Sequence, residues 1–254
     1  MRVLAASDLL SVWERAGHAG PLQQALALLS AACPDRDADV LADLSIGERD
    51  ALLLRLREAT FGPHLTGVVA CPACGEQIEI AVNVADLQAG ARQPAVFAAA
   101  GDIAPAAEDV AVEVDGYRLR LRPPSSRDVM AASQRDVADA AAVLVRRCLV
   151  SAHRDAGAVA AGEVPAAVLA IAEQRLAEAD PRADIRLRLA CPSCGRDATT
   201  PLDIVSFFWR EIDAWACRIL REVHTLASTY GWTEEAILAL SPFRRQCYLE
   251  LVGP

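Results

Sequence analysis

The sequence predicts an α+β fold that is mostly helical, with a central four-cysteine zinc ribbon and an inserted β-hairpin followed by helices. A repeated motif predicts the ribbon: Cys71-Pro72-Ala73-Cys74-Gly75 returns as Cys191-Pro192-Ser193-Cys194-Gly195. The 116 residues between Cys74 and Cys191 predict the insertion. Apolar residues that recur every three or four positions through much of the remaining chain predict the helices.

Each copy of the motif supplies half of a metal site. The Cys-x-x-Cys spacing turns two sulfurs towards one point, and the following glycine suits a tight turn. Because tetrahedral zinc takes four ligands, we expect Cys71, Cys74, Cys191 and Cys194 to hold one structural Zn²⁺ with no open position. A redox-active pair is the weaker interpretation, because such chemistry uses a single motif at a helix start.

The motifs divide the chain into four parts. We expect an N-terminal helical segment over 1–67 and a C-terminal helical segment over 204–254. The two halves of the ribbon fall at 68–90 and 184–203, and they clamp the ends of an insertion over 91–183.

Composition argues against some functions. The 254 residues carry a formal charge of −9, and all 25 basic residues are arginine. An acidic chain repels a phosphate backbone, which disfavours nucleic-acid binding. Without lysine there is no Schiff-base chemistry and no phosphate-binding lysine of a P-loop.

The expected compartment is the cytoplasm. The first ten residues include Asp8 and lack the basic start and apolar run of a signal peptide. The longest stretch without Asp, Glu or Arg, 16–34, contains Gly17 and Pro21, so it suits a core helix and not a membrane span. A reducing compartment favours metal over disulfides for the paired cysteines.

Helix signals open the chain. Short apolar patterns predict helices over 8–15 and 21–32, the second with Pro21 in its first turn. Ser45 and Glu48 form a capping-box pattern that begins a helix ending near 61–63.

Strand signals flank the two motifs. Residues 78–82 alternate apolar and polar side chains, as in a half-buried strand, and 185–189 alternate into the second motif as the partner strand. Residues 89–107 are rich in Ala, Pro and Gly and predict a linker.

The insertion begins with a hairpin signal. Alternating strands meet at Asp115-Gly116, the sequence of a tight hairpin turn. Two helices are expected next, over about 133–151 and 165–179.

The longest predicted helix follows Asp203, its N-cap, and ends at Tyr230. Its heavy apolar stripe needs a cover, which is either the rest of the chain or another subunit. As a partner-binding surface we assign this helix and the shorter helices after it. Its key residues are Phe208, Trp215, Trp232, Arg244 and Arg245.

No catalytic arrangement is recognisable. The remaining cysteines stand alone and are expected to be small buried hydrophobes: Cys33, Cys148, Cys217 and Cys247. The four histidines are scattered, and no phosphate-binding loop or nucleophile elbow occurs. We therefore expect a protein without enzymatic activity.

A family resemblance rests on two stretches. The run from Gly47-Glu48-Arg49-Asp50 to Phe61-Gly62, leading into Cys71, resembles the baseplate hub assembly chaperone family of contractile-tailed phages. More closely, it resembles zinc-ribbon relatives encoded with phage-tail-like contractile injection systems. The ending from Tyr230-Gly231-Trp232 to Tyr248-Leu249 is also similar to those proteins.

The resemblance implies a non-enzymatic assembly or structural role at the baseplate or spike hub, with baseplate, spike or other tail proteins as partners. The phage members do not all carry the paired motifs, which leaves both a transient chaperone and a permanent component open. The alternative is a nucleic-acid-binding or regulatory zinc ribbon, which the arginine clusters favour: Arg118, Arg120, Arg122, Arg186 and Arg188.

Overall fold

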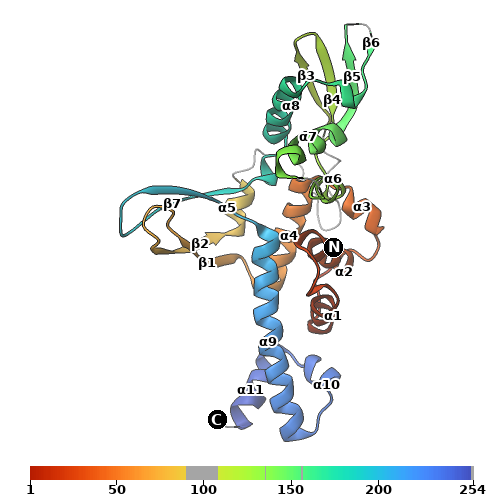
Figure 1. Cartoon of the computed structure of the whole chain (residues 1–254). Helices are drawn as coiled ribbons and strands as arrows, with labels where there is room; N and C mark the ends of the chain where they lie inside the picture. Colours follow the sequence, from red (N-terminus) through yellow and green to blue (C-terminus); the bar gives the residue numbers. More distant parts are fainter. Residues whose placement is uncertain (90–107, 135, 156, 253–254) are drawn as a thin grey trace.

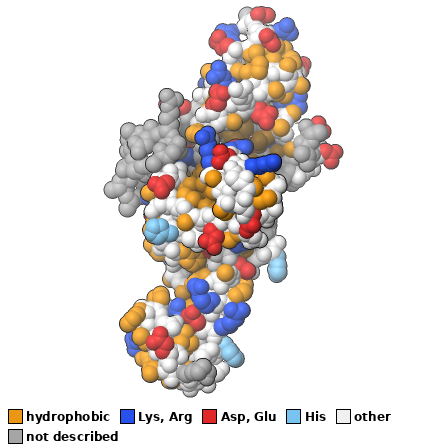
Figure 2. All heavy atoms as spheres, turned by 90° about the vertical axis from the view of Figure 1, so that its left-hand side faces the viewer, with side chains coloured by type: hydrophobic (Ala, Val, Ile, Leu, Met, Phe, Trp, Pro, Cys, Tyr) orange, Lys and Arg blue, Asp and Glu red, His pale blue; other side chains and the backbone are white. Residues whose placement is uncertain are grey.

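A computed structural model describes residues 1–89, 108–134, 136–155 and 157–252. The molecule is elongated, with a helical body in the middle, a mixed module at one end and a small helical lobe at the other (Figure 1). Two β-ribbons project sideways from the body (Figure 1). Figure 2, which looks onto this side, shows charged side chains of both signs spread over all parts.

Four helices precede the first ribbon, and together with the first half of the long helix they form the body. They are α1 (Ala6–Ala16), α2 (Pro21–Ala32), α3 (Ala38–Ala42) and α4 (Ile46–Phe61). The capping box is confirmed, because the Glu48 N–H donates to Ser45 Oγ at 3.1 Å and the Ser45 N–H to Glu48 Oε2 at 2.9 Å. Gly62, with φ +92°, ends α4.

Helix α9 (Ile204–Tyr230) is the axis of the molecule. Asp203 caps its start by accepting the Ser206 N–H at 3.1 Å, and left-handed Gly231 ends it, as expected. Its apolar side packs first in the body, through Phe208, and then under α10 (Glu234–Leu238) and α11 (Pro242–Val252), through Leu226. The rest of the chain therefore covers the stripe.

The module at the other end has a core of its own. It contains β3 (Val110–Val114), β4 (Tyr117–Leu121), α6 (Ser126–Ala132), α7 (Val137–Cys148), β5 (Leu149–Arg154), β6 (Gly157–Ala158) and α8 (Ala166–Ala179). Single 3₁₀ turns lie at Ala161–Glu163 and Pro181–Ala183. The hairpin turn is confirmed, with φ of 48° at Asp115 and 77° at Gly116.

Two expectations for this part change. The helix predicted over 133–151 forms as α7, but it begins four residues later and ends at Cys148, and α6 before it was not foreseen. Leu149 begins β5, which pairs with β4 and extends the sheet, so the last three residues of the predicted helix belong to a strand. An unforeseen helix, α5 (Val84–Ala89), precedes the predicted linker, whose remainder lies outside the described residues.

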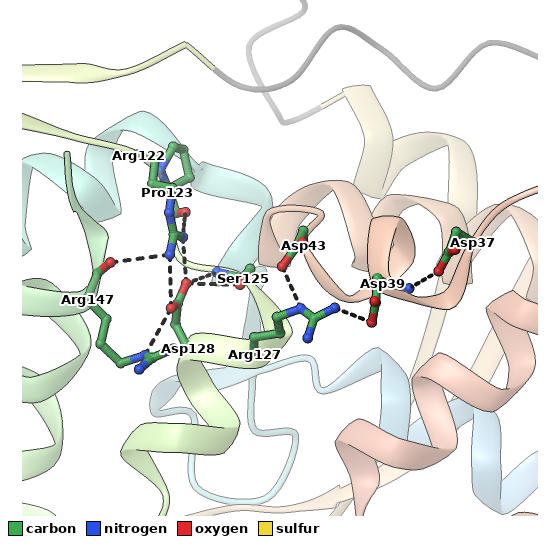
Figure 3. A network of polar contacts seen from close by, with 9 residues as sticks. All are labelled: Asp37, Asp39, Asp43, Arg122, Pro123, Ser125, Arg127, Asp128 and Arg147. Atoms are coloured by element: carbon green, nitrogen blue, oxygen red, sulfur yellow. Dashed lines mark hydrogen bonds and ion pairs between the residues drawn. The ribbon is translucent and has the colours of Figure 1, made fainter.

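A polar junction joins this module to the body (Figure 3). The Asp128 carboxylate is fully buried and accepts hydrogen bonds from Ser125, Arg122 and Arg147. Backbone contacts cross to α4, where Ile46 N–H donates to the Pro124 carbonyl at 3.0 Å. A further bond runs from Gly47 N–H to Asp180 Oδ2, at 2.9 Å.

Candidate metal centre

Two closed hairpins carry the cysteine motifs. Strands β1 (His64–Ala70) and β2 (Gln77–Asn83) pair with each other, as do β7 (Arg186–Ala190) and β8 (Asp197–Pro201). The prediction that 185–189 pairs with the first ribbon was therefore wrong. Each motif turns the chain straight back, so the nearest partner strand is the local one.

Both motifs fold into the same turn at the tip of their ribbon. The Cys71 N–H donates to the Glu76 carbonyl at 2.7 Å, and the Cys191 N–H donates to the Arg196 carbonyl at 3.0 Å. The glycine that follows each motif has a positive φ, 77° at Gly75 and 68° in the second copy. That conformation strains residues with a Cβ, which explains the glycine of the motif.

The four motif sulfurs meet between the ribbon tips. All of them lie within 4.8 Å of one another. Cys71 Sγ is 3.8 Å from Cys194 Sγ, and Cys74 Sγ is 3.7 Å from Cys191 Sγ. A tetrahedron with zinc–sulfur bonds of about 2.3 Å has edges of about 3.8 Å. The cluster therefore has the size of a tetrahedral thiolate site, and the spacing is far too long for disulfides.

Burial and charge also favour a cation here. The first cysteine of each motif is buried, with Ile78 and Leu189 packed beside it. Hydrogen bonds from the N–H groups of Ala73 and Cys74 lower the pKa of the Cys71 thiol to about 7. The N–H of Glu76 acts in the same direction on Cys74, but the three neighbouring sulfurs and burial together outweigh it and raise the pKa of Cys74 to about 12. Four sulfurs this close cannot all be thiolates without a cation among them.

The other cysteines stand apart from this cluster. Cys33 and Cys148 are buried, as expected for small hydrophobes. That expectation was wrong for Cys217, which is exposed on α9, and Cys247 is only half-buried. Among the described residues, the four motif cysteines form the one group of His, Cys, Asp or Glu side chains close enough together to hold a metal.

The residues assigned to a partner-binding surface differ in how exposed they are. Phe208 is fully buried and packs edge-on against Phe61, and Arg245 is buried in an ion pair with Glu222 at 2.7 Å. Neither side chain is accessible to a partner in this structure, because apolar spacing alone does not show which element covers a helix. Trp215 is half-buried in the cores along α9.

Two of the assigned residues remain accessible in the C-terminal lobe. Trp232 is half-buried and stacks on Tyr230, with ring centroids 4.7 Å apart. Arg244 is exposed, with its guanidinium 5.8 Å from the ring centroid of Tyr248.

The arginine clusters are largely engaged within the chain. Arg122 binds the buried Asp128, Arg120 pairs with Asp109 at 3.1 Å, and Arg186 pairs with Asp184 at 2.7 Å. On the side from which the ribbons project, acidic side chains lie among the basic ones (Figure 2). These contacts within the chain weaken the nucleic-acid alternative, because the engaged arginines are not free for a phosphate backbone.

Together the fold and site define a mixed α/β protein with a cluster of four cysteines, suited to a metal ion, at the tips of two β-ribbons. The chain belongs to the T4 bacteriophage base plate protein family, whose model matches residues 4–209. No curated protein and no solved structure matches the chain. The match covers the body, both ribbons and the inserted module, and it ends within α9. Among the described residues, no helix is long and apolar enough to span a membrane.

Proposed function

We propose that this chain is a non-enzymatic structural or assembly protein of the baseplate or spike hub in a phage-tail-like contractile injection system. The observation that carries the proposal is the baseplate family match over 4–209. Other tail or baseplate proteins are its proposed partners. The finer assignment to the zinc-ribbon relatives of the hub assembly chaperones is supported by the two motifs and by their meeting at one cluster.

A single structural Zn²⁺ is the proposed cofactor, held by Cys71, Cys74, Cys191 and Cys194. Thiolates select soft or borderline metals, and the sulfur spacing fits tetrahedral zinc. When bound, zinc would supply a cross-link between the ribbons. Four protein ligands fill the tetrahedron and leave no position for substrate, which supports a structural role over a catalytic one.

The test is to purify a tagged copy from the producing cells and to identify what comes with it. Recovery of baseplate, spike or other tail proteins is expected, and recovery of none of them would overturn the proposal. Assembly is expected in the cytoplasm of those cells. Mass spectrometry of mature particles separates the two roles, since a permanent component stays in the particle and a transient chaperone is absent from it.

A further inference from the structure

The two ribbons leave an unfilled space between them. A groove of about 530 Å³ lies between the β1–β2 ribbon, the β7–β8 ribbon and the start of α9. Its lining is mainly apolar and includes Leu65, Val69, Ile80, Val82, Leu187 and Phe207. Towards the cysteines the space between the ribbons narrows to about 130 Å³, where Ile78 and Leu189 line it and pack beside the sulfurs. The groove therefore widens away from the metal centre, towards the body.

The floor of the groove is held firmly. Arg57 forms a two-pronged ion pair with Glu211, with N–O distances of 2.8 and 2.6 Å, and its guanidinium lies 5.9 Å from the ring centroid of Phe207. A Cβ at Gly67 would lie 3.3 Å from the Phe207 ring, so this glycine lets β1 pass close over the floor. Exposed apolar grooves of this kind mark sites of interaction with another molecule.

One edge of the groove is an unpaired strand edge. A backbone hydrogen bond lies at each end of the β1–β2 ladder. At one end the Cys71 N–H donates to the Glu76 carbonyl, and at the other the Val84 N–H donates to the Pro63 carbonyl. Because hydrogen-bonded pairs alternate along such a ladder, the backbone groups of Thr66 and Val68 point away from β2. In the part of the chain that the structure describes, β1 pairs with β2 alone.

This free edge opens onto the groove. Alternate residues of β1 face inward, and the side chains of Thr66 and Val68 lie on the exposed face, where Val68 is 57 % exposed. Both residues nevertheless line the groove, together with Leu65, Gly67 and Val69 between and beside them. Five consecutive lining residues show that the groove follows the backbone of β1.

We propose that this groove binds an extended apolar segment of a partner protein, which adds a strand to the edge of β1. The backbone of that segment would pair with Thr66 and Val68, and its alternate apolar side chains would enter between the ribbons. Residues Leu65 to Val69 span about 13 Å of strand, so four or five partner residues fit. A helix would fill the apolar space but would leave the edge unpaired. That the partner is a tail protein rests on the proposed function.

The probe is a yeast-displayed library of seven-residue peptides with Val, Ile, Leu or Phe at alternate positions, compared with a library of the same composition without alternation. Both are panned against the full-length, zinc-loaded protein. We expect enrichment from the alternating library alone. Binding of the selected peptide should slow the hydrogen exchange of the Thr66 and Val68 amides at least about ten-fold.

A matched pair of variants tests the strand edge. Thr66 and Ala81 lie directly opposite each other in the ribbon, and the N–H of each points away from it on opposite edges. Thr66→Pro removes the donor on the groove side and should weaken peptide binding about ten-fold or more, whereas Ala81→Pro should leave it unchanged. Circular dichroism and metal content confirm that both variants fold.

A second pair tests the groove without touching a strand. Ala214 is exposed on α9 and lines the groove, whereas Ser228, also small, is exposed on the same helix outside the groove. Ala214→Trp fills the space and should reduce binding about ten-fold, and Ser228→Trp should have no effect. Two results would overturn the proposal. One is peptide affinity that neither Thr66→Pro nor Ala214→Trp changes, and the other is selection of peptides whose apolar residues do not alternate. A dimer that forms with rising protein concentration and that Thr66→Pro abolishes would also overturn it, because the groove would then bind a second copy of this chain.

The experiments distinguish a failure of the groove proposal from a failure of the proposed function. If the tagged chain joins tail proteins and Thr66→Pro changes neither that association nor peptide binding, the groove proposal is wrong and the proposed function stands. If the variants change peptide binding as expected and the chain never associates with tail proteins, the groove proposal stands and the proposed function is wrong.

Discussion

The inserted module is attached to the rest of the molecule at two places that use opposite chemistry. The ribbons that flank it in sequence meet at four sulfurs whose spacing suits a metal ion. The junction with α3 uses carboxylates and arginines (Figure 3), and backbone hydrogen bonds continue it to α4. With the proposed metal, the first attachment uses a ligand from outside the chain, whereas the second is complete within it. Loss of metal should therefore release one attachment and leave the other.

The charged junction is stable because each buried charge has partners. Burial disfavours the Asp128 carboxylate, but hydrogen bonds from Arg122 and Ser125 outweigh it and lower the pKa of Asp128 to about 2. Arg127 reaches across to Asp39 and Asp43 at α3. These exposed pairs add little stability and mainly fix the orientation of α6.

Removal of the metal should produce the largest effect. Structural zinc contributes on the order of 10–16 kcal/mol in small peptides, far more than two short ribbons gain by burying apolar surface. We expect about one zinc per chain by elemental analysis. Cys191→Ser should lose the metal and the protection of the ribbon amides against hydrogen exchange, while the amides of β4 and β5 stay protected.

The matched control is Cys217→Ser, which changes an exposed cysteine away from the cluster and should keep the full zinc content. A wild type with no metal or with two ions per chain would contradict the shared site. The ribbon attachment would then not depend on one shared metal ion, and the contrast with the charged junction would be lost.

Breaking the charged junction should produce the next largest effect. Asp128→Asn removes a fully buried charge and replaces one of the two oxygens that accept from Arg122 and Arg147 by an NH₂ donor. Breaking a fully buried pair costs about 3–5 kcal/mol, and because both arginines are half-exposed we expect about 2–3 kcal/mol of lost unfolding free energy in urea. Asp39→Asn, at an exposed carboxylate, should cost less than about 0.5 kcal/mol.

The pH dependence checks the same contact. The pKa of Asp128 is about 2 in the folded protein, against 3.8 for the ordinary group. A carboxyl with a lowered pKa stabilises the fold fully above its unfolded pKa and loses that contribution as the pH falls towards the folded value. The wild type should lose this increment between about pH 4 and pH 2, and Asp128→Asn should lack it. An unchanged acid profile in the variant would contradict the assignment.

The two attachments also differ in how far the sequence predicts them. The cysteine cluster was predicted because its ligands sit in a local, repeated motif, and the caps of α4 and α9 are local in the same way. The junction was missed because Asp128 lies between the predicted hairpin and the helix predicted from about 133, where no local pattern marks it as buried. Its partner Arg147 lies 19 residues away, and only the fold brings Asp180 to α4. The groove was missed for the same reason, since its walls come from two ribbons more than a hundred residues apart.

A tight backbone approach at the junction gives the third prediction. A Cβ at Gly47 would lie 1.8 Å from Asp180 Oδ1, so Gly47→Ala must displace the carboxylate that accepts the Gly47 N–H. We expect a loss of about 1–2 kcal/mol, although alanine favours a helix. Gly162→Ala has free space around it and should be neutral. In the background of Asp180→Ala the loss should largely vanish, and a full loss there would contradict the proposed clash.

An effect of similar size to that of Gly47→Ala should come from Asp50, whose pKa is shifted in the opposite direction to that of Asp128. Burial raises its pKa to about 6, despite the ion pair with Arg49 at 2.7 Å. Between about pH 4 and pH 6 the folded state binds more protons than the unfolded state, so this group makes stability fall as the pH rises. One pKa unit corresponds to about 1.36 kcal/mol, and after allowance for residual solvent access we expect a fall of about 1–2 kcal/mol.

Urea unfolding across that pH range measures this fall. Asp50→Asn should flatten it, and Asp39→Asn should not. If the slope survives in Asp50→Asn, Asp50 is not the group that makes stability fall over this pH range, and the assignment of its raised pKa is wrong.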